Sequence, residues 1–284
     1  MKKNTQSSPF YCLFMAIMLL ASTRATAQTK QKWFRTEFGV AQSAVYDNGH
    51  SLVQYKGTGL QLHVGNDAER AKSYAQFDNQ LIWTPLSAQV ADDKYASSTQ
   101  QGNYRMSYTY LRKLPKTQDK TVKIAVGGSV SGDFNMRFYP IQNNAFSWDF
   151  NLGLNVAARA QHDFTFKKRS FSISYQLGLP LLTYNHRPNY LGYFPIGEIF
   201  EGKSGTSADW QSLGRVVAGV NGKYFYMTQQ ITLDKINPNG NRIRLAYNWQ
   251  YANNGFATHK YQNILSGFSL GILTNLSKKS KDSN

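Results

Sequence analysis

The stretch FSWDFNLGLNVAAR, Phe146 to Arg159, alternates two kinds of side chain with a period of two. One set is large and apolar and the other is small, polar or charged: Phe146, Trp148, Phe150, Leu152, Leu154 and Val156 against Ser147, Asp149, Asn151, Gly153, Asn155 and Arg159. Successive side chains of a β-strand point to opposite faces. The stretch therefore predicts a strand with one apolar face and one polar face.

The same pattern recurs at 104–110, 242–251 and 267–272. A secreted β-sandwich would also alternate, but several runs reach 12 or more residues, beyond the roughly 5 to 6 of a globular strand. Such runs suit the roughly 9 to 11 residues that cross a bilayer at a tilt. Many of the 18 Tyr, 17 Phe and 5 Trp stand at the ends of the runs, where an aromatic girdle would meet the membrane surface. The sequence predicts an all-β protein, a transmembrane antiparallel up-and-down β-barrel.

Ten to twelve strands are expected, with ten preferred, because single-chain bacterial barrels have an even number. The expected strands are 33–45, 52–65, 73–84, 103–113, 120–139, 144–160, 168–181, 222–235, 240–252 and 262–275. The segment 213–221 offers one more. Short connections would then lie at one end of the barrel with both termini, in the periplasm, and the long connections 85–102 and 182–221 would lie outside.

The N-terminus has the three parts of a secretory signal: basic Lys2 and Lys3, an apolar run at 10–21, and the triplet Ala25-Thr26-Ala27. The run is too short for a membrane-spanning helix. Cleavage is expected after Ala27, which leaves one domain, 28–284, exported to the cell outer membrane. The only cysteine, Cys12, leaves with the signal.

Cleavage also removes three of the 32 basic residues, so 29 remain against 16 acidic ones, a net charge of +13. A basic exported protein favours lipopolysaccharide phosphates and anionic lipids over nucleic acid as partners. Basic loops and a basic tail explain the charge equally well. A monomer is favoured.

The signal, the alternating aromatic strands and segments such as 242–249 resemble the uncharacterised outer-membrane β-barrel proteins of Bacteroidota. The resemblance covers the whole mature chain. It implies the fold and the location, and it brings no functional residue with it.

No catalytic constellation is found in the sequence. His186-Arg187-Pro188-Asn189 has Pro where the phospholipase-like pattern needs a serine nucleophile, and adjacent Asp92 and Asp93 would point to opposite strand faces. The five histidines, at 50, 63, 162, 186 and 259, lack metal-ligand spacing. We expect no catalytic residue, no metal and no cofactor.

Two groups of residues are candidates for ligand contact. If the apolar faces meet lipid, a set of basic side chains points into the lumen beside Glu37, Asp78 and Asp149: Arg105, Lys123, Arg159, Arg242 and Arg244. These form either a salt-bridged plug or a basic constriction that selects anions. The long external connection supplies the second group: Tyr184, His186, Arg187, Tyr190 and Trp210. That loop either clamps a ligand or packs into the mouth of the barrel.

Three functions follow as hypotheses. The first is non-enzymatic binding or passage of a small anionic or amphiphilic ligand, or partnership in an envelope complex. The second is a lipid- or lipopolysaccharide-modifying enzyme, and the third is a structural or adhesive surface barrel.

Overall fold

The computed structural model describes residues 31–47, 53–89, 96–138, 146–186, 214–218, 224–256 and 259–277. These residues form eleven strands and one 3-10 turn, η1 (Pro115–Thr117). The strands are β1 (Gln31–Asp47), β2 (Gln54–Glu69), β3 (Ser73–Gln89), β4 (Ala96–Lys113), β5 (Lys123–Phe138), β6 (Phe146–Phe166), β7 (Arg169–His186), β8 (Gly214–Ala218), β9 (Tyr224–Ile236), β10 (Arg242–Phe256) and β11 (His259–Asn275). No helix in the described part of the chain is long and apolar enough to cross a membrane.

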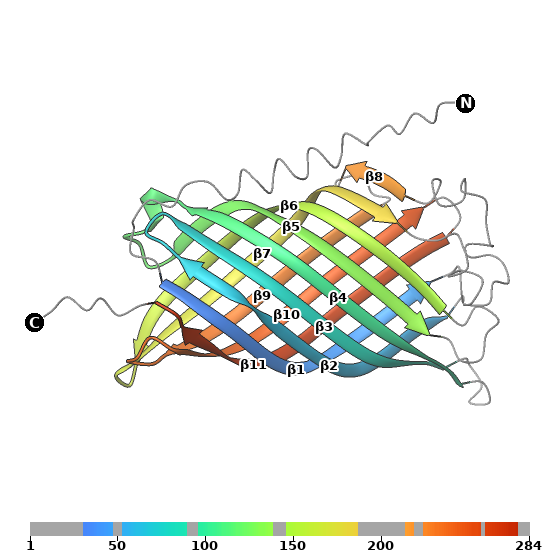
Figure 1. Ribbon diagram of the computed structural model, residues 1–284, viewed down its shortest axis with the longest axis horizontal. Helices are drawn as coiled ribbons and strands as arrows, with labels where there is room; N and C mark the ends of the chain where they lie inside the picture. Colours follow the sequence, from blue (N-terminus) through green and yellow to red (C-terminus); the bar gives the residue numbers. More distant parts are fainter. Residues whose placement is uncertain are drawn as a thin grey trace, which may run out of the picture.

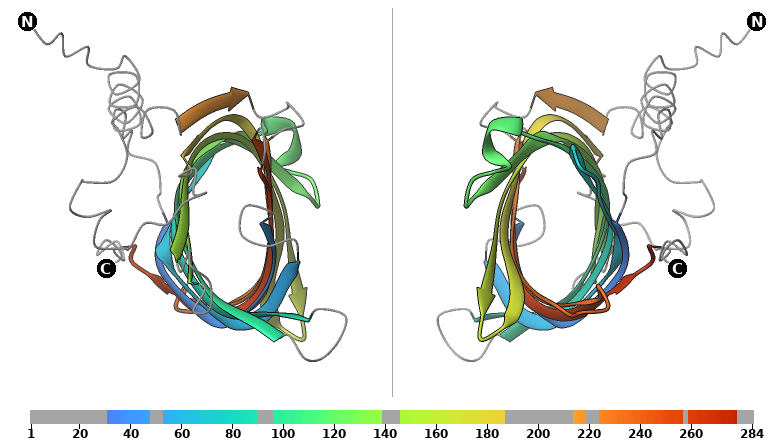
Figure 2. Two further views of the ribbon diagram at one scale, coloured as in Figure 1. Left: turned by 90° about the vertical axis from the view of Figure 1, so that its right-hand side faces the viewer. Right: turned by 90° about the vertical axis from the view of Figure 1, so that its left-hand side faces the viewer.

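The strands form one closed antiparallel barrel, seen from the side in Figure 1 and end-on in Figure 2. Apart from β8, which β9 bypasses to pair with β7, neighbours in the sequence pair with each other, and β1 closes the ring by pairing with β11 over Trp33 to Asp47. β8 pairs only with the end of β7, so ten of the eleven strands build the wall. The predicted fold class and the preferred count of ten are confirmed. The extra segment expected at 213–221 is the short β8.

Most strands are longer than the sequence predicts, although β5 and β9 are shorter. β3 and β4 pair as far as Gln89 and Ala96, so the connection expected at 85–102 is mostly sheet. β7 continues to His186, so the prediction that Tyr184 and His186 belong to an external loop is wrong. At the end of β3 the usual polarity is lost because the inner face turns apolar, with Leu86 and Ala88 buried in one cluster, whereas the hydrogen-bonded ladder continues with the neighbouring strand.

The two faces of the barrel invert the polarity of a soluble protein. Large apolar side chains cover the outside, including Phe38 at 58% and Leu270 at 62% exposure. The buried interior is dominated by polar and charged side chains. In water the outer surface would cost roughly 25 cal/mol for each Å² of apolar area, but lipid removes that cost, as in membrane barrels.

The short connections lie together at one end, the turn end, as the alternation of strands predicted. Lys167 and Lys168 make the two-residue hairpin between β6 and β7, both with positive φ, at 47° and 63°. Gly240, with φ 82°, lies in the turn before β10, and its carbonyl accepts a 2.9 Å hydrogen bond from Trp33 Nε1. The first and last strands meet at the same end, where Leu276 N donates to Lys32 O at 2.7 Å.

Candidate functional site: the barrel lumen

The five basic residues predicted to point inward all lie on the inner strand faces. They alternate with outward apolar neighbours, as Arg242 and Arg244 do with the exposed Ile243 and Leu245. Arg105, Arg159, Arg242 and Arg244 are buried, and Lys123 is half-exposed at the turn end of β5. Glu37, Asp78 and Asp149 point inward with them.

Arg244 is the centre of the turn-side cluster, the buried ion-paired group on the hairpin side of the lumen. Its Nε and Nη2 donate to the two oxygens of Asp234 at 2.7 and 2.8 Å, and Nη1 donates to Asp67 Oδ2 at 3.1 Å. Arg35 pairs with Asp78, Asp67 and Glu37, and Arg242 with Asp234 and Glu69. The turn-side cluster comprises Arg35, Glu37, Asp67, Glu69, Asp78, Asp234, Arg242 and Arg244.

A second group, the loop-side cluster, lies toward the other end of the barrel. Arg137 Nη2 donates to Asp149 Oδ2 at 2.8 Å, and its Nε lies 3.8 Å from Asp47. Arg105 lies 3.6 Å from Asp133, which also accepts from Tyr226 OH at 3.1 Å. The loop-side cluster comprises Asp47, Arg105, Asp133, Arg137, Asp149 and Tyr226.

Pairing of opposite charges thus dominates the lumen. Arg159, for which no ion pair is found among the described residues, stacks its guanidinium 4.1 Å from the ring centre of Tyr74. Buried charges are costly unless they are paired and hydrogen-bonded. Of the two hypotheses for the lumen charges, this arrangement favours the salt-bridged plug over the basic constriction.

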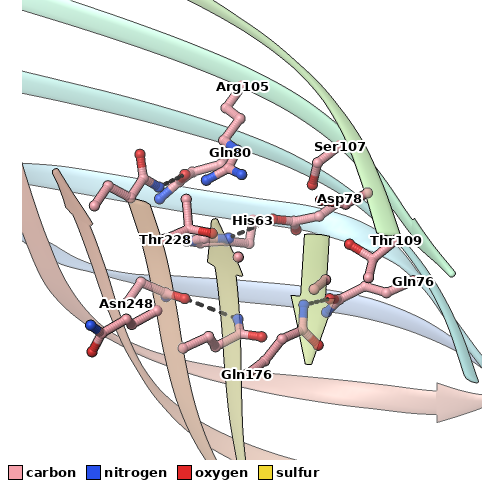
Figure 3. A pocket seen from close by; sticks show the side chains of 16 residues that line it. His63, Gln76, Asp78, Gln80, Arg105, Ser107, Thr109, Gln176, Thr228 and Asn248 are labelled. Atoms are coloured by element: carbon pink, nitrogen blue, oxygen red, sulfur yellow. Dashed lines mark hydrogen bonds and ion pairs between the residues drawn. The ribbon is translucent and has the colours of Figure 1, made fainter. Parts of the chain in front are cut away.

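A cavity of about 50 Å³ lies between the two clusters (Figure 3). Along β9, for example, Thr228 and Gln230 line the cavity between Asp234 and Tyr226. Amides dominate the lining, and they bond across neighbouring strands or across the lumen. Gln230 donates to Asn248 at 2.9 Å, Gln250 to Gln80 at 2.6 Å and Gln176 to Gln76 at 3.2 Å.

Two of these amides leave an atom unpaired. Asn248 is 7% exposed and its Oδ1 accepts from Gln230, but its Nδ2 has no hydrogen-bond partner. Gln176 uses its Nε2 on Gln76, and its Oε1 has no partner. A buried polar group without a partner costs about 1–3 kcal/mol, so a free donor and a free acceptor on one cavity favour a guest that can both accept and donate, such as water or a hydroxyl group.

His63 also lines the cavity, a role that was not predicted from the sequence. Its Nδ1 lies 3.4 Å from Asp78 Oδ2 and its Nε2 lies 3.4 Å from Gln61 Oε1. The signal was available, because His63 alternates with the outward Leu62 and Val64. No Ser or Thr hydroxyl bonds to the ring, and no metal-binding group of His, Cys, Asp or Glu occurs, among the described residues. The His–Asp pair thus lacks the nucleophile of a serine hydrolase.

The candidates in the external connection are only partly described. Tyr184 lies on β7, and β7 ends at His186, whose side chain is outside the described residues. Arg187, Tyr190 and Trp210 lie outside them altogether. Their roles remain predictions.

The chain belongs to the family described as protein of unknown function DUF3316, whose model matches residues 11–282. No curated protein matches the chain. Among solved structures, the outer membrane protease OmpT from Escherichia coli superposes with a TM-score of 0.52 at 6% identity, over 90% of this chain and 99% of that one. At that identity the likeness shows the fold of an outer-membrane barrel.

Two autotransporter domains match with lower scores. The translocator domain of NalP from Neisseria meningitidis has a TM-score of 0.33 at 8% identity, over 93% of this chain and 96% of that one. The β-domain of the Bordetella autotransporter BrkA has a TM-score of 0.34 at 10% identity, over 85% and 98%.

Proposed function

We propose that this protein is a monomeric outer-membrane barrel that binds a small amphiphile by its neutral, hydroxyl-bearing head group in the cavity between the two clusters, without enzymatic activity. Export by a signal cleaved after Ala27 and a source among Bacteroidota belong to the same proposal and rest on the sequence. The observation that carries the proposal is the pair of amide atoms, Asn248 Nδ2 and Gln176 Oε1, that line one polar cavity without a hydrogen-bond partner among the described residues.

The lining favours a neutral head group over the anion that the net charge first suggested. The ionisable groups of the cavity are His63, Asp78 and Arg105, and each already has a partner: His63 with Asp78, Asp78 with Arg35, and Arg105 with Asp133. The remaining lining is mostly amide and hydroxyl groups, which recognise hydroxyls by accepting and donating hydrogen bonds. Hydroxyl groups can both accept from Asn248 Nδ2 and donate to Gln176 Oε1, whereas a carboxylate can satisfy only the donor.

The cavity size supports binding of a small group. One water needs about 10–15 Å³ of such volume, so about 50 Å³ accommodates several waters or a head group of a few heavy atoms. Ion-paired layers lie on both sides of the cavity along the barrel. This argues against a diffusion channel, which needs a continuous aqueous path.

A structural surface barrel is the second candidate, and the ion-paired lumen favours it, since a plugged barrel suffices for that role. The two candidates differ at Asn248. If the barrel is structural, an apolar substitution of Asn248 that fills the cavity should increase stability. If the barrel binds a ligand, the same substitution should weaken binding. A lipid-modifying enzyme receives no support from the cavity, because His63 lacks a nucleophile partner.

The test is photo-crosslinking of a diazirine-bearing monoacylglycerol to the protein in lipid nanodiscs, with unlabelled 1-monooleoylglycerol and oleate as competitors. We expect saturable labelling that monooleoylglycerol displaces better than oleate, and a loss of roughly tenfold in Asn248→Leu, the cost of about one polar contact. Asn263→Leu is the matched control, because Asn263 is also a buried, inward amide but does not line the cavity.

Labelling that does not saturate, or that Asn248→Leu leaves unchanged, would overturn the binding proposal and favour the structural barrel. Stronger displacement by oleate would overturn the neutral head group and restore the anionic ligand.

A further inference from the structure

The barrel wall has an interrupted seam between β7 and β9. These strands pair from Ser170 and Ile236 to Gly178 and Thr228, where the pairing ends. From Leu182 onward β7 pairs with β8 instead. Among the described residues, 179–181 of β7 and 224–227 of β9 therefore have no partner across the seam. Figure 2 shows β8 lying outside the ring of wall strands.

The sequence GLPLL at 178–182 accounts for the interruption. Pro180 has no N–H to donate, so proline inside a sheet is confined to strand edges and bulges. On the opposite side of β7 the register with β6 shifts by one residue, because Asn155 pairs with Pro180 but Leu154 pairs with Leu182. A bulge bends its strand and disrupts the ladder, and here it turns β7 away from β9.

The lumen cavity reaches this seam. Gly178, Thr228 and Gln229 are among its lining residues. Thr228 points inward in the alternation of β9, and Gln229 belongs to the outward row with Met227 and Ile231. The cavity therefore reaches the last residues that pair across the seam, Gly178 with Thr228 and Leu177 with Gln229.

Gly178 leaves room for the side chain of Thr228, its partner in the last strand pair. A Cβ at this position would lie 2.6 Å from Thr228 Oγ1. Gln229 adds a polar amide to a lipid-facing row, where its one described side-chain bond is from Nε2 to Met227 Sδ at 3.8 Å. Polar side chains at membrane depth are costly and commonly mark a path for a polar group.

The outer rim of the seam is apolar. On the β7 side Leu179 and Leu181 are exposed. On the other side Tyr251 lies between two aromatic rings, with centroids 6.1 Å from Phe225 and 6.1 Å from Trp249. This surface suits an acyl chain, because it continues the lipid phase up to the polar cavity.

We infer that the seam between β7 and β9 is a lateral portal, through which a single-chain amphiphile in the membrane passes its neutral head group into the cavity while its acyl chain stays in lipid. The inference rests on the proposed function for the identity of the ligand. The portal itself follows from the strand pairing, Pro180 and the cavity lining.

The portal is tested first without any ligand, by thiol labelling in a Cys12→Ser background. Ser129→Cys places a thiol in the cavity, and Ser174→Cys places one on the inner face of the closed part of the seam; both serines are buried. N-dodecylmaleimide dissolved in liposomes should label Ser129→Cys roughly tenfold or more faster than Ser174→Cys. A thiol that the portal does not reach is labelled only when the wall opens locally. Equal rates for the two variants would overturn the portal.

The second test closes the seam. Leu179→Cys with Met227→Cys forms a disulfide between the first unpaired positions, and Ile173→Cys with Leu233→Cys forms one where the strands already pair. The first disulfide should slow labelling by the diazirine monoacylglycerol by roughly tenfold, because entry then requires local opening of the wall, and reduction should restore the rate. The second disulfide should leave the rate unchanged.

The two proposals fail separately. Selective maleimide labelling without saturable monoacylglycerol binding would keep the portal and overturn the ligand. Saturable binding with equal maleimide rates and no effect of the 179–227 disulfide would keep the binding function and overturn the portal.

Discussion

Replacing Arg244 by methionine should destabilise the barrel more than any single change at its surface. The guanidinium is 1% exposed and makes three hydrogen bonds of 2.7 to 3.1 Å to Asp234 and Asp67. Methionine preserves much of the side-chain volume but leaves both carboxylates buried without that partner. Removing one member of a buried ion pair costs about 3–5 kcal/mol, and the second carboxylate places Arg244→Met at the upper end of that range.

The free energy of unfolding is measured by urea titration of the protein in lipid vesicles, followed by tryptophan fluorescence. Lys123→Met is the control, because Lys123 and Asp163 are also 2.7 Å apart but are 40% and 37% exposed, and exposed pairs contribute less than about 1 kcal/mol. The double variant Arg244→Met, Asp234→Asn should lose about 0.5–3 kcal/mol less stability than the sum of the losses in the two single variants. Equal losses for Arg244→Met and Lys123→Met would refute the charge-paired plug.

Three further predictions concern the turn end and conduction. Replacing Lys167-Lys168 by Asn-Gly should raise the free energy of unfolding by about 1 kcal/mol in the same urea titration, because both positions have positive φ, which Asn and Gly adopt at lower cost; a lower stability would contradict the hairpin geometry. Gly240→Ala, at φ 82°, should lower stability by about 1–2 kcal/mol, and an unchanged urea midpoint would count against the turn. In planar bilayers the inserted wild-type protein should pass no steady current, because the lumen charges are paired. An anion-selective current that Arg242→Gln abolishes would instead support the hypothesis of a basic constriction.

The sequence predicted the wall of this barrel because its signal is local. Alternation at 146–159 fixes which side chains of β6 face lipid, and the same rule places Arg105 and Arg242 inside. The strand ends were predicted less well. At Tyr184 the alternation shifts at the bulge beside Pro180, so the periodicity stops before the strand does.

Only the tertiary structure decided how the inward residues combine. Arg244 bonds to Asp67, 177 residues away, and His63 meets Asp78 on the next strand. Such contacts depend on the register of every strand pair and on the closure of β1 against β11. Period-two alternation determines neither of these, because each inward residue could face many partners. The sequence by itself therefore determined the barrel and the direction of its side chains. Pairing across the closed lumen decided that the charges form two clusters and that amides line the cavity between them, and the strand pairing beside Pro180 decided where β7 parts from β9.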